Sequence, residues 1–98
     1  MNERVAGLVG IARRGNRLAL GFDACRRAVA KQKVALIILA EDLSPASATR
    51  WRHRLHASSI RVVVHGGKSE WGRLLGREQV GIIAVLDVGL AKAILQKL

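Results

Sequence analysis

The chain has 98 residues, enough for one domain with one apolar core and too few for two. Half of its residues are hydrophobic, so the composition is not that of a disordered chain. Seventeen Lys and Arg against seven Asp and Glu give a net charge of +10, and Arg is more frequent than Lys. This charge attracts polyanions, and guanidinium groups both match phosphate oxygens and stack on bases, which favours a nucleic acid partner over a lipid surface. A basic surface that only keeps the protein soluble is the alternative.

Three further features bear on the compartment. The longest apolar run, residues 34–40, is much shorter than the ~18 residues that a membrane span needs. The single cysteine, Cys25, cannot form an internal disulfide, and the N-terminus lacks the pattern of a secretion signal. We therefore expect a cytoplasmic, monomeric protein that does not cross a membrane.

The pattern of apolar residues predicts helices that alternate with strands. Residues 3–14 carry apolar side chains at helical spacing, and this helix is expected to end in a left-handed cap at Gly15. A short strand over 17–20 and an amphipathic helix over 23–30 follow. Residues 34–40 are all apolar, which predicts a central strand that is covered on both faces.

The second half of the chain continues this alternation, and a second wholly apolar strand predicts that the sheet is covered on both faces. The predicted fold class is α/β, a three-layer α-β-α sandwich around a mixed, mostly buried four-stranded sheet, with residues 1–98 as one domain. The expected elements are a helix from Ser44-Pro45 to about Ser58, a strand over 60–64, a short helix capped by Ser69 and ended by Gly76, the apolar strand over 80–86, and a helix over 90–98.

Patterns that would indicate catalysis or metal binding are incomplete. Residues 64–69 resemble a phosphate-binding loop, but Val62 stands where that loop needs its first glycine. His53 and His56 lie one helical turn apart with no further ligands to complete a metal site. Cys25 has no His near it in sequence, and a helical Cys is usually a core residue. We expect no catalytic residue, no metal and no cofactor.

The two tryptophans and the basic residues remain as candidates for RNA contact. Trp51 and Trp71 recur at helical spacing with Leu or Ala, so they are predicted to fill the core rather than to stack on bases. Eight of the seventeen cations lie in the first 33 residues. A helix that starts after Gly21 offers free N–H groups to a phosphate, and a merely solvated helix face is the alternative. The candidate RNA contacts of this region are Arg13, Arg14, Asn16, Arg17, Gly21, Phe22, Asp23, Arg26, Arg27 and Lys31.

Two stretches of sequence, together with the order of the elements, resemble the L7Ae/L30e ribosomal-protein family. They are Ala40-Glu41-Asp42-Leu43-Ser44-Pro45 and Lys68-Ser69-Glu70-Trp71-Gly72-Arg73-Leu74-Leu75-Gly76. Residues 10–15 and 18–21 look most similar to the bacterial L7Ae-like (YlxQ-like) branch, whose members are often encoded beside transcription-termination factors.

The resemblance implies an α-β-α sandwich that binds structured RNA, typically a kink-turn, with the start of the second helix and the loop before the last strand. Archaeal members begin that helix with Gly-Thr-Asn-Glu, followed by a Lys three residues after the Glu. The matching positions here are Gly21, Phe22, Asp23, Ala24 and Arg27, so only the Gly and the basic residue agree. The second contact loop maps to residues 77–81, of which Arg77, Gln79 and Val80 are the implied contacts. The resemblance thus implies RNA binding with an altered specificity.

The sequence as a whole predicts a non-catalytic RNA-binding protein of the translation or transcription machinery. Its expected partner is a structured RNA, either kink-turn-like or looped, and ribosomal RNA is one candidate. Components of the transcription-termination machinery or of the ribosome are the expected protein partners. Two alternatives remain open. One is a protein-interaction or substrate-holding module that works with a separate catalytic partner, and the other is a nucleotide-binding enzyme built on residues 66–69.

Overall fold

The structure, a computed structural model, describes residues 1–98. Helices and strands alternate along the chain, which confirms the predicted α/β class. The elements are α1 (Glu3–Arg14), β1 (Leu18–Leu20), α2 (Phe22–Ala30), β2 (Leu36–Leu39), α3 (Pro45–Leu55), β3 (Arg61–Val64), α4 (Lys68–Leu75), β4 (Ile82–Val85) and α5 (Val88–Lys97).

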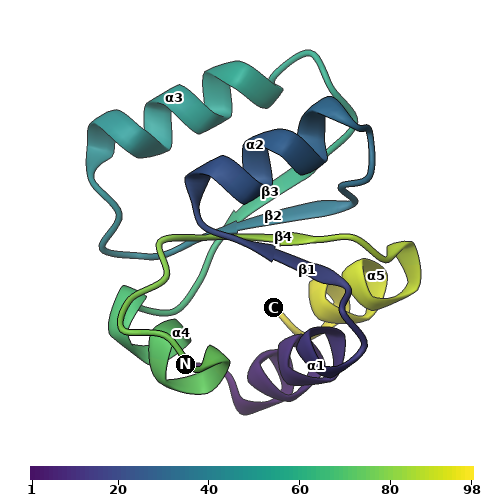
Figure 1. Cartoon of the computed structure of the whole chain (residues 1–98), viewed down its shortest axis with the longest axis vertical. Helices are drawn as coiled ribbons and strands as arrows, with labels where there is room; N and C mark the ends of the chain where they lie inside the picture. Colours follow the sequence, from purple (N-terminus) through teal and green to yellow (C-terminus); the bar gives the residue numbers. More distant parts are fainter.

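The four strands form one mixed sheet in the order β1-β4-β2-β3 (Figure 1). Strand β4 pairs antiparallel with both β1 and β2, and β2 pairs parallel with β3. Every residue of β2 and of β4 is buried, as the two wholly apolar runs predict. The strand that comes last in the sequence therefore lies in the interior of the sheet.

Helices cover both faces of this sheet. Figure 1 shows α2 and α3 on one face and α1, α4 and α5 on the other. Because successive side chains of a strand point to opposite faces, β2 contributes to both cores. Leu36 and Ile38 pack in the core beneath α1, α4 and α5, whereas Ile37 and Leu39 pack in the core beneath α2 and α3. This arrangement confirms the three-layer sandwich.

Both tryptophans are buried, as predicted, and each belongs to a different core. Trp71 of α4 is 1% exposed and donates its indole N–H to the His65 carbonyl oxygen at 2.6 Å. The indole ring of Trp71 can lie this close to the backbone because residue 66 is a glycine. A Cβ atom on Gly66 would lie 2.6 Å from Trp71 Nε1, and its φ of +72° also favours glycine. Trp51 of α3 lies in the opposite core and is 5% exposed.

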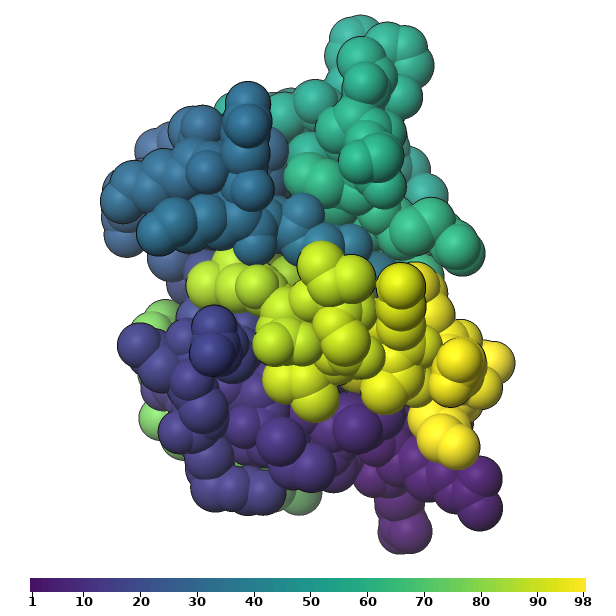
Figure 2. Space-filling model, turned by 90° about the vertical axis from the view of Figure 1, so that its right-hand side faces the viewer, coloured from purple at the N-terminus to yellow at the C-terminus, as the bar shows by residue number.

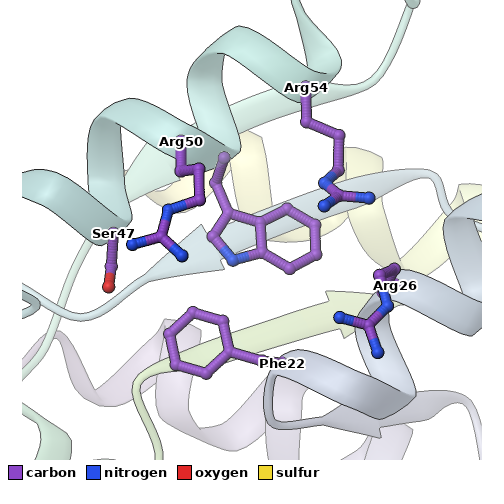
Figure 3. A pocket seen from close by; sticks show the side chains of 6 residues that line it. Phe22, Arg26, Ser47, Arg50 and Arg54 are labelled. Carbon is purple, nitrogen blue, oxygen red and sulfur yellow. The ribbon is translucent and has the colours of Figure 1, made fainter.

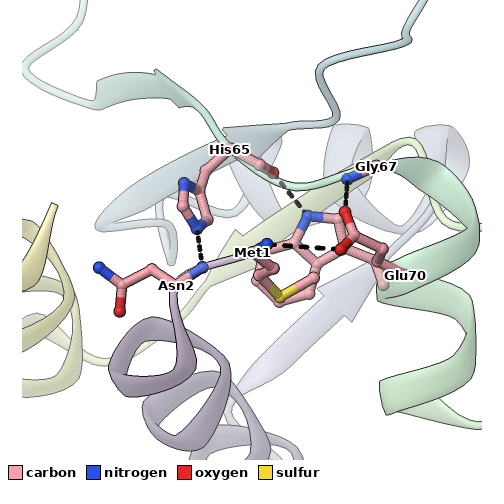
Figure 4. A network of polar contacts seen from close by, with 6 residues as sticks. Met1, Asn2, His65, Gly67 and Glu70 are labelled. Atoms are coloured by element: carbon pink, nitrogen blue, oxygen red, sulfur yellow. Dashed lines mark hydrogen bonds and ion pairs between the residues drawn. The ribbon is translucent and has the colours of Figure 1, made fainter.

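A polar network joins the N-terminus to the turn before α4 (Figure 4). The Asn2 N–H donates to His65 Nε2 at 3.1 Å, and the Met1 ammonium lies 3.4 Å from Glu70 Oε2. Glu70 Oε1 accepts the Gly67 N–H at 2.8 Å. This hydrogen bond and the nearby ammonium lower the pKa of Glu70. The predicted cap at Ser69 is therefore wrong, because α4 begins at Lys68 and its first turn is closed by the Glu70 side chain.

The ends of several other elements also differ from the prediction. Gly15 has an ordinary φ of −84°, and the left-handed residue after α1 is Asn16, with a φ of 57°. The apolar runs 34–40 and 80–86 are longer than the strands they contain, because residues beside a strand can be buried without joining its ladder. Helix α3 ends at Leu55, before the expected Ser58.

Besides α4, two further helices begin before the predicted residues. Helix α2 begins at Phe22, one residue early. Helix α5 begins at Val88, two residues before the predicted start. The Asp87 side chain caps it there by accepting the Leu90 N–H at 2.8 Å. The predicted end of α4 at Gly76 is confirmed, and Gly76 adopts a left-handed conformation with a φ of 76°. No helix of the structure is both long and apolar enough to cross a membrane.

Candidate RNA interface

Four connecting segments meet at one end of the sheet. Gly21 follows β1, and the antiparallel pairing of β1 with β4 places it beside Ile82, whose carbonyl oxygen accepts the Gly21 N–H at 3.1 Å. The segment after β2 reaches the same end, where the Ala40 N–H donates to the Gly81 carbonyl oxygen at 2.9 Å. Strand β3 runs parallel to β2 and so leads α4 to this end as well. The sheet topology thus assembles a site from segments far apart in sequence.

A groove of about 370 Å³ lies where these segments meet, and we call it the sheet-end groove. The start of α4 is fixed beside the loop before β4, because the Val80 N–H donates to the Lys68 carbonyl oxygen at 3.0 Å. The lining includes basic, hydroxyl and amide side chains but no Asp or Glu. The lining residues are Gly21, Phe22, Leu43, Ser44, Ser47, Lys68, Arg77, Gln79, Val80 and Gly81.

The start of α2 borders this groove without a side-chain cap. Gly21 adopts φ 86° and ψ 167°, a conformation that essentially only glycine populates. No side chain accepts the first N–H groups of the helix, so these donors remain available to a ligand. Asp23 does not serve as a cap, since its carboxylate lies 2.8 Å from Arg26 Nη2 in an exposed ion pair.

The loop before β4 is held against α4. The Arg77 N–H donates to the Gly72 carbonyl oxygen at 2.8 Å, directly after the left-handed turn at Gly76. Gly72 is buried, and the absence of a side chain there lets the loop backbone approach the helix. The position of Arg77 and Gln79 at the groove therefore depends on this glycine.

Nearly all the positive charge of the protein is free of internal partners. Arg26 is the only Lys or Arg side chain with a carboxylate oxygen within 4.0 Å, and the other ion pair joins the N-terminal ammonium to Glu70. Exposed cations of this kind can contact phosphates without first losing an ion pair within the protein. The charge pattern is suited to a polyanionic partner.

The predicted contacts fall into two groups. Gly21, Phe22, Arg77, Gln79 and Val80 all line the sheet-end groove, so the two segments implied by the family resemblance do meet. Val80 offers little of its side chain, which is 2% exposed and packs in the core. The structure also leaves three predicted residues of α2 exposed beside this site, namely Asp23, Arg26 and Arg27.

The second group lies at the opposite end of the sheet. Arg17 precedes β1, and its carbonyl oxygen accepts the Leu86 N–H at 2.8 Å, beyond the end of β4. A strand of three residues spans about 10 Å, which separates this end from Gly21. Figure 2 shows residues 13–17 and 31–35 on this face, on either side of the start of α5. The group consists of Arg13, Arg14, Asn16, Arg17 and Lys31, and the structure does not bring it to the groove.

Several lining residues were not predicted from the sequence, among them Lys68, Ser44 and Ser47. Lys68 and Ser44 belong to the two stretches that carry the family resemblance. Their place in those stretches is the one feature of the sequence that could have indicated a role at the site. Their approach to Gly21 depends on strand pairing between distant segments, which local sequence patterns do not encode.

Cys25 lies buried in the core beneath α2 and α3. Burial raises the pKa of the Cys25 thiol to about 12, and its sulfur lies 3.3 Å from the Ala19 carbonyl oxygen. A thiol held protonated in this way is not a nucleophile at neutral pH. The structure also holds no group of three His, Cys, Asp or Glu residues that could coordinate a metal ion.

The glycine-rich turn before α4 has backbone N–H groups that are already bonded within the protein and cannot bind a phosphate. Its Gly67 N–H is bonded to Glu70 Oε1, and the Lys68 N–H donates to Asp42 Oδ1 at 2.9 Å. In a phosphate-binding loop these backbone N–H groups point at the phosphate. Two carboxylates occupy them here, and they would also repel a triphosphate. The geometry argues against a nucleotide-binding enzyme.

Comparison with known proteins supplies the family. Residues 3–95 match the Ribosomal protein L7Ae/L30e/S12e/Gadd45 family. The fold is similar to that of a protein of unknown function from Bacillus halodurans C, with a TM-score of 0.88 and 25% identity over 98% of this chain and 96% of the other. It is also similar to the Giardia lamblia 15.5kD RNA binding protein, with a TM-score of 0.80 and 17% identity over 97% of this chain and 85% of the other. No curated protein sequence matches significantly. Since the family match spans nearly the whole sequence, the chain belongs to the L7Ae/L30e/S12e/Gadd45 family.

Proposed function

We propose that the protein is a non-catalytic RNA-binding protein that docks structured RNA in the sheet-end groove. One observation carries the proposal. The start of α2 and the loop before β4, which the family resemblance relates to RNA contact, line a single groove that contains Lys68 and Arg77 and no carboxylate. Family membership supports an RNA partner independently of this geometry.

The chemistry of the groove suits the RNA backbone. The free N–H groups at the start of α2 and the cations of Lys68 and Arg77 complement phosphate oxygens. The Gln79 side-chain amide can both donate to and accept from a base edge. Asp23 can only accept, and it is paired with Arg26, so we infer that recognition relies on the shape of a bent or looped RNA, kink-turn-like in outline.

The family also supports a setting for this activity. Its name includes ribosomal proteins, and we infer that the RNA belongs to the translation or transcription machinery in the cytoplasm. The unpaired, buried Cys25 agrees with a reducing compartment. No cofactor is required by the proposed activity, which is binding alone.

The proposal is tested by measuring affinity for a kink-turn hairpin and for a perfectly paired hairpin across a range of salt concentrations. Log affinity should fall linearly with log salt, with a slope of about −0.9 for each phosphate neutralised on a duplex. The variant Lys68→Ala/Arg77→Ala should bind more weakly. Its slope of log affinity against log salt should be nearer zero, by the amount that corresponds to about two fewer phosphates neutralised. The matched control Lys92→Ala/Lys97→Ala removes the same charge from α5 and should change the affinity much less.

Other outcomes would replace the proposal. Absent or salt-independent RNA binding would overturn it. A nucleoside triphosphate bound by the wild type and lost in Lys68→Ala would instead favour an enzyme. To identify the natural RNA, crosslinking in cells followed by sequencing of the bound fragments is the most direct measurement.

A further inference from the structure

A second, smaller pocket lies between α2 and α3, and we call it the α2–α3 pocket (Figure 3). It has a volume of about 120 Å³ and shares Phe22 and Ser47 with the sheet-end groove. The family resemblance assigns it no role. Its remaining lining residues are Arg26, Arg50, Trp51 and Arg54.

An aromatic pair forms the floor of this pocket. The rings of Phe22 and Trp51 are stacked, with their centroids 6.2 Å apart and their planes 24° from parallel. Trp51 is almost wholly buried, whereas Phe22 is 44% exposed. A large apolar ring that is half exposed and held flat by a second ring offers one free face on which a planar group can stack.

Arginines surround the aromatic pair, and two of them are free to bind an anion. The Cζ atom of Arg54 lies 5.5 Å from the centroid of the Trp51 ring, in a cation–π contact that orients the guanidinium at the pocket. Arg50 lies one turn before Arg54 on the same side of α3 (Figure 3). Neither has a carboxylate within 4.0 Å, whereas Arg26 is paired with Asp23. The pocket thus has a net positive charge.

The indole N–H of Trp51 adds a hydrogen-bond donor that the protein leaves unused. Trp71 donates its indole N–H to His65, but the Trp51 N–H donates to no group of the protein. No fully enclosed polar atom of the protein lacks a partner, so this N–H is accessible to solvent, and Trp51 is one of the residues that line the pocket. Water satisfies such a donor in the free protein, and a bound acceptor group takes the place of that water. The indole N–H, Arg50 and Arg54 can only donate, and the complementary group is an anionic acceptor.

We propose that the α2–α3 pocket binds one unpaired nucleotide of the RNA held in the sheet-end groove. The nucleotide phosphate is bound by Arg50, Arg54 and the Trp51 indole N–H, and the base stacks on the exposed face of Phe22. The inference rests on RNA binding as proposed above. A strand that leaves the groove reaches the pocket directly, because Phe22 and Ser47 border both.

The size and chemistry of the pocket favour this occupant over others. A drug-sized ligand needs a pocket of roughly 300–1,000 Å³, so this space admits a single phosphate or ring and no folded partner. An acidic peptide would match the arginines but would leave the exposed ring of Phe22 without a planar group to stack on it. A nucleotide supplies both the anion and the planar group.

The test compares a ten-nucleotide oligouridylate with a blunt RNA duplex as probes. The variant Arg50→Ala/Arg54→Ala should lose about tenfold or more in affinity for the single strand beyond its loss for the duplex. The matched control Arg52→Ala/Arg61→Ala removes the same charge from exposed positions that line neither the pocket nor the groove, and it should lose affinity equally for both probes. Equal losses in the two variants would show a general charge effect and would overturn the inference.

Two further readouts separate stacking from charge. Oligouridylate should quench the tryptophan emission of the wild type, and the quenching should be lost in Arg50→Ala/Arg54→Ala but kept in the control. Phe22→Leu, which keeps an apolar side chain but removes the ring, should reproduce the selective loss for the single strand in a protein whose thermal unfolding is unchanged. Tighter binding of decaglutamate than of oligouridylate would assign the pocket to an acidic peptide and overturn the inference.

Failure of the proposed function would be recognised separately. In that case neither the hairpins nor the oligonucleotide would bind the wild type with salt dependence, and Lys68→Ala/Arg77→Ala would have no effect. If only the further inference fails, hairpin binding and its dependence on Lys68 and Arg77 remain, while the arginines of α3 contribute no more than their charge.

Discussion

Gly72 and Glu78 approach each other so closely that a Cβ atom on Gly72 would lie 2.5 Å from the Glu78 carbonyl oxygen. Because the obstructing atom belongs to the backbone, the conflict cannot be relieved by turning a side chain. We predict that Gly72→Ala destabilises the protein by about 1–3 kcal/mol, measured by urea unfolding, and also displaces the loop that carries Arg77. RNA affinity should fall even where the variant is folded.

A matched glycine provides the control for this prediction. Gly7 lies within α1, and a Cβ atom there would meet nothing within 4 Å. Gly7→Ala should therefore stabilise the protein by about 0.5–1 kcal/mol, because alanine loses less backbone entropy in a helix. If both alanine variants changed stability alike, the close approach at Gly72 would not determine the position of the loop.

The arginines at the far end of the sheet should contribute little to binding of a short RNA. Arg13 and Arg14 are separated from the groove by the length of β1, about 10 Å, which exceeds the ~8 Å Debye length at physiological salt. We predict that Arg13→Ala/Arg14→Ala changes the affinity for a short hairpin less than about threefold at 0.15 M salt. A longer RNA that extends past the groove should show a larger loss. A loss for the short hairpin as great as that of Lys68→Ala/Arg77→Ala would contradict the assignment of the groove.

Stability should depend on the charge of Glu70 in acid. The Gly67 N–H, followed by the N-terminal ammonium, lowers the pKa of Glu70 in the folded protein. A lowered folded-state pKa means that the contribution is present above the ordinary Glu pKa and is lost as the pH falls through the folded value. Glu70→Gln keeps an acceptor for Gly67 but removes the charge. Its melting temperature should lie below that of the wild type at pH 7, and the two should converge as the pH falls through the lowered folded-state pKa of Glu70. A difference independent of pH would exclude an ionic contribution.

Cys25 should resist modification in the folded state. Burial raises the pKa of its thiol to about 12, so almost no thiolate exists at pH 8. We predict that iodoacetamide leaves the native protein unmodified at pH 8 over a time in which the urea-unfolded chain is fully alkylated, as measured by intact mass. Rapid alkylation of the native protein would mean that α2 opens readily from the sheet.

The sequence was a reliable guide where local patterns decide the structure. The bounds of α1, residues 3–14, agree with the prediction although its cap does not, because apolar spacing and the basic last turn act within the helix itself. The burial of β2 and β4 on both faces follows from their unbroken apolar composition. The cap of α4 was predicted wrongly because Ser69 has the right local preference, but the Glu70 carboxylate competes for the same first turn.

The candidate site was predicted only in part, for a topological reason. The start of α2 was identified from its free N–H groups and the family resemblance, but Lys68 was not related to it. These positions meet because β4 pairs with β1 on one side and β2 on the other. Arg17 and Gly21 are close in sequence, but β1 lies between them, so only Gly21 borders the groove.

The interior position of β4 has a consequence for the order of events during synthesis. Strands β1 and β2 do not pair with each other, because β4 (Ile82–Val85) lies between them and pairs with both. Until those residues leave the ribosome, the chain can form its helices and the β2–β3 pair, but β1 has no partner and the loop that completes the groove has no anchor. Such non-local pairing also slows folding compared with a helical protein of this length. The groove proposed to bind RNA is therefore completed only once β4 has paired, so a chain whose synthesis stops early carries most of the positive charge without the groove.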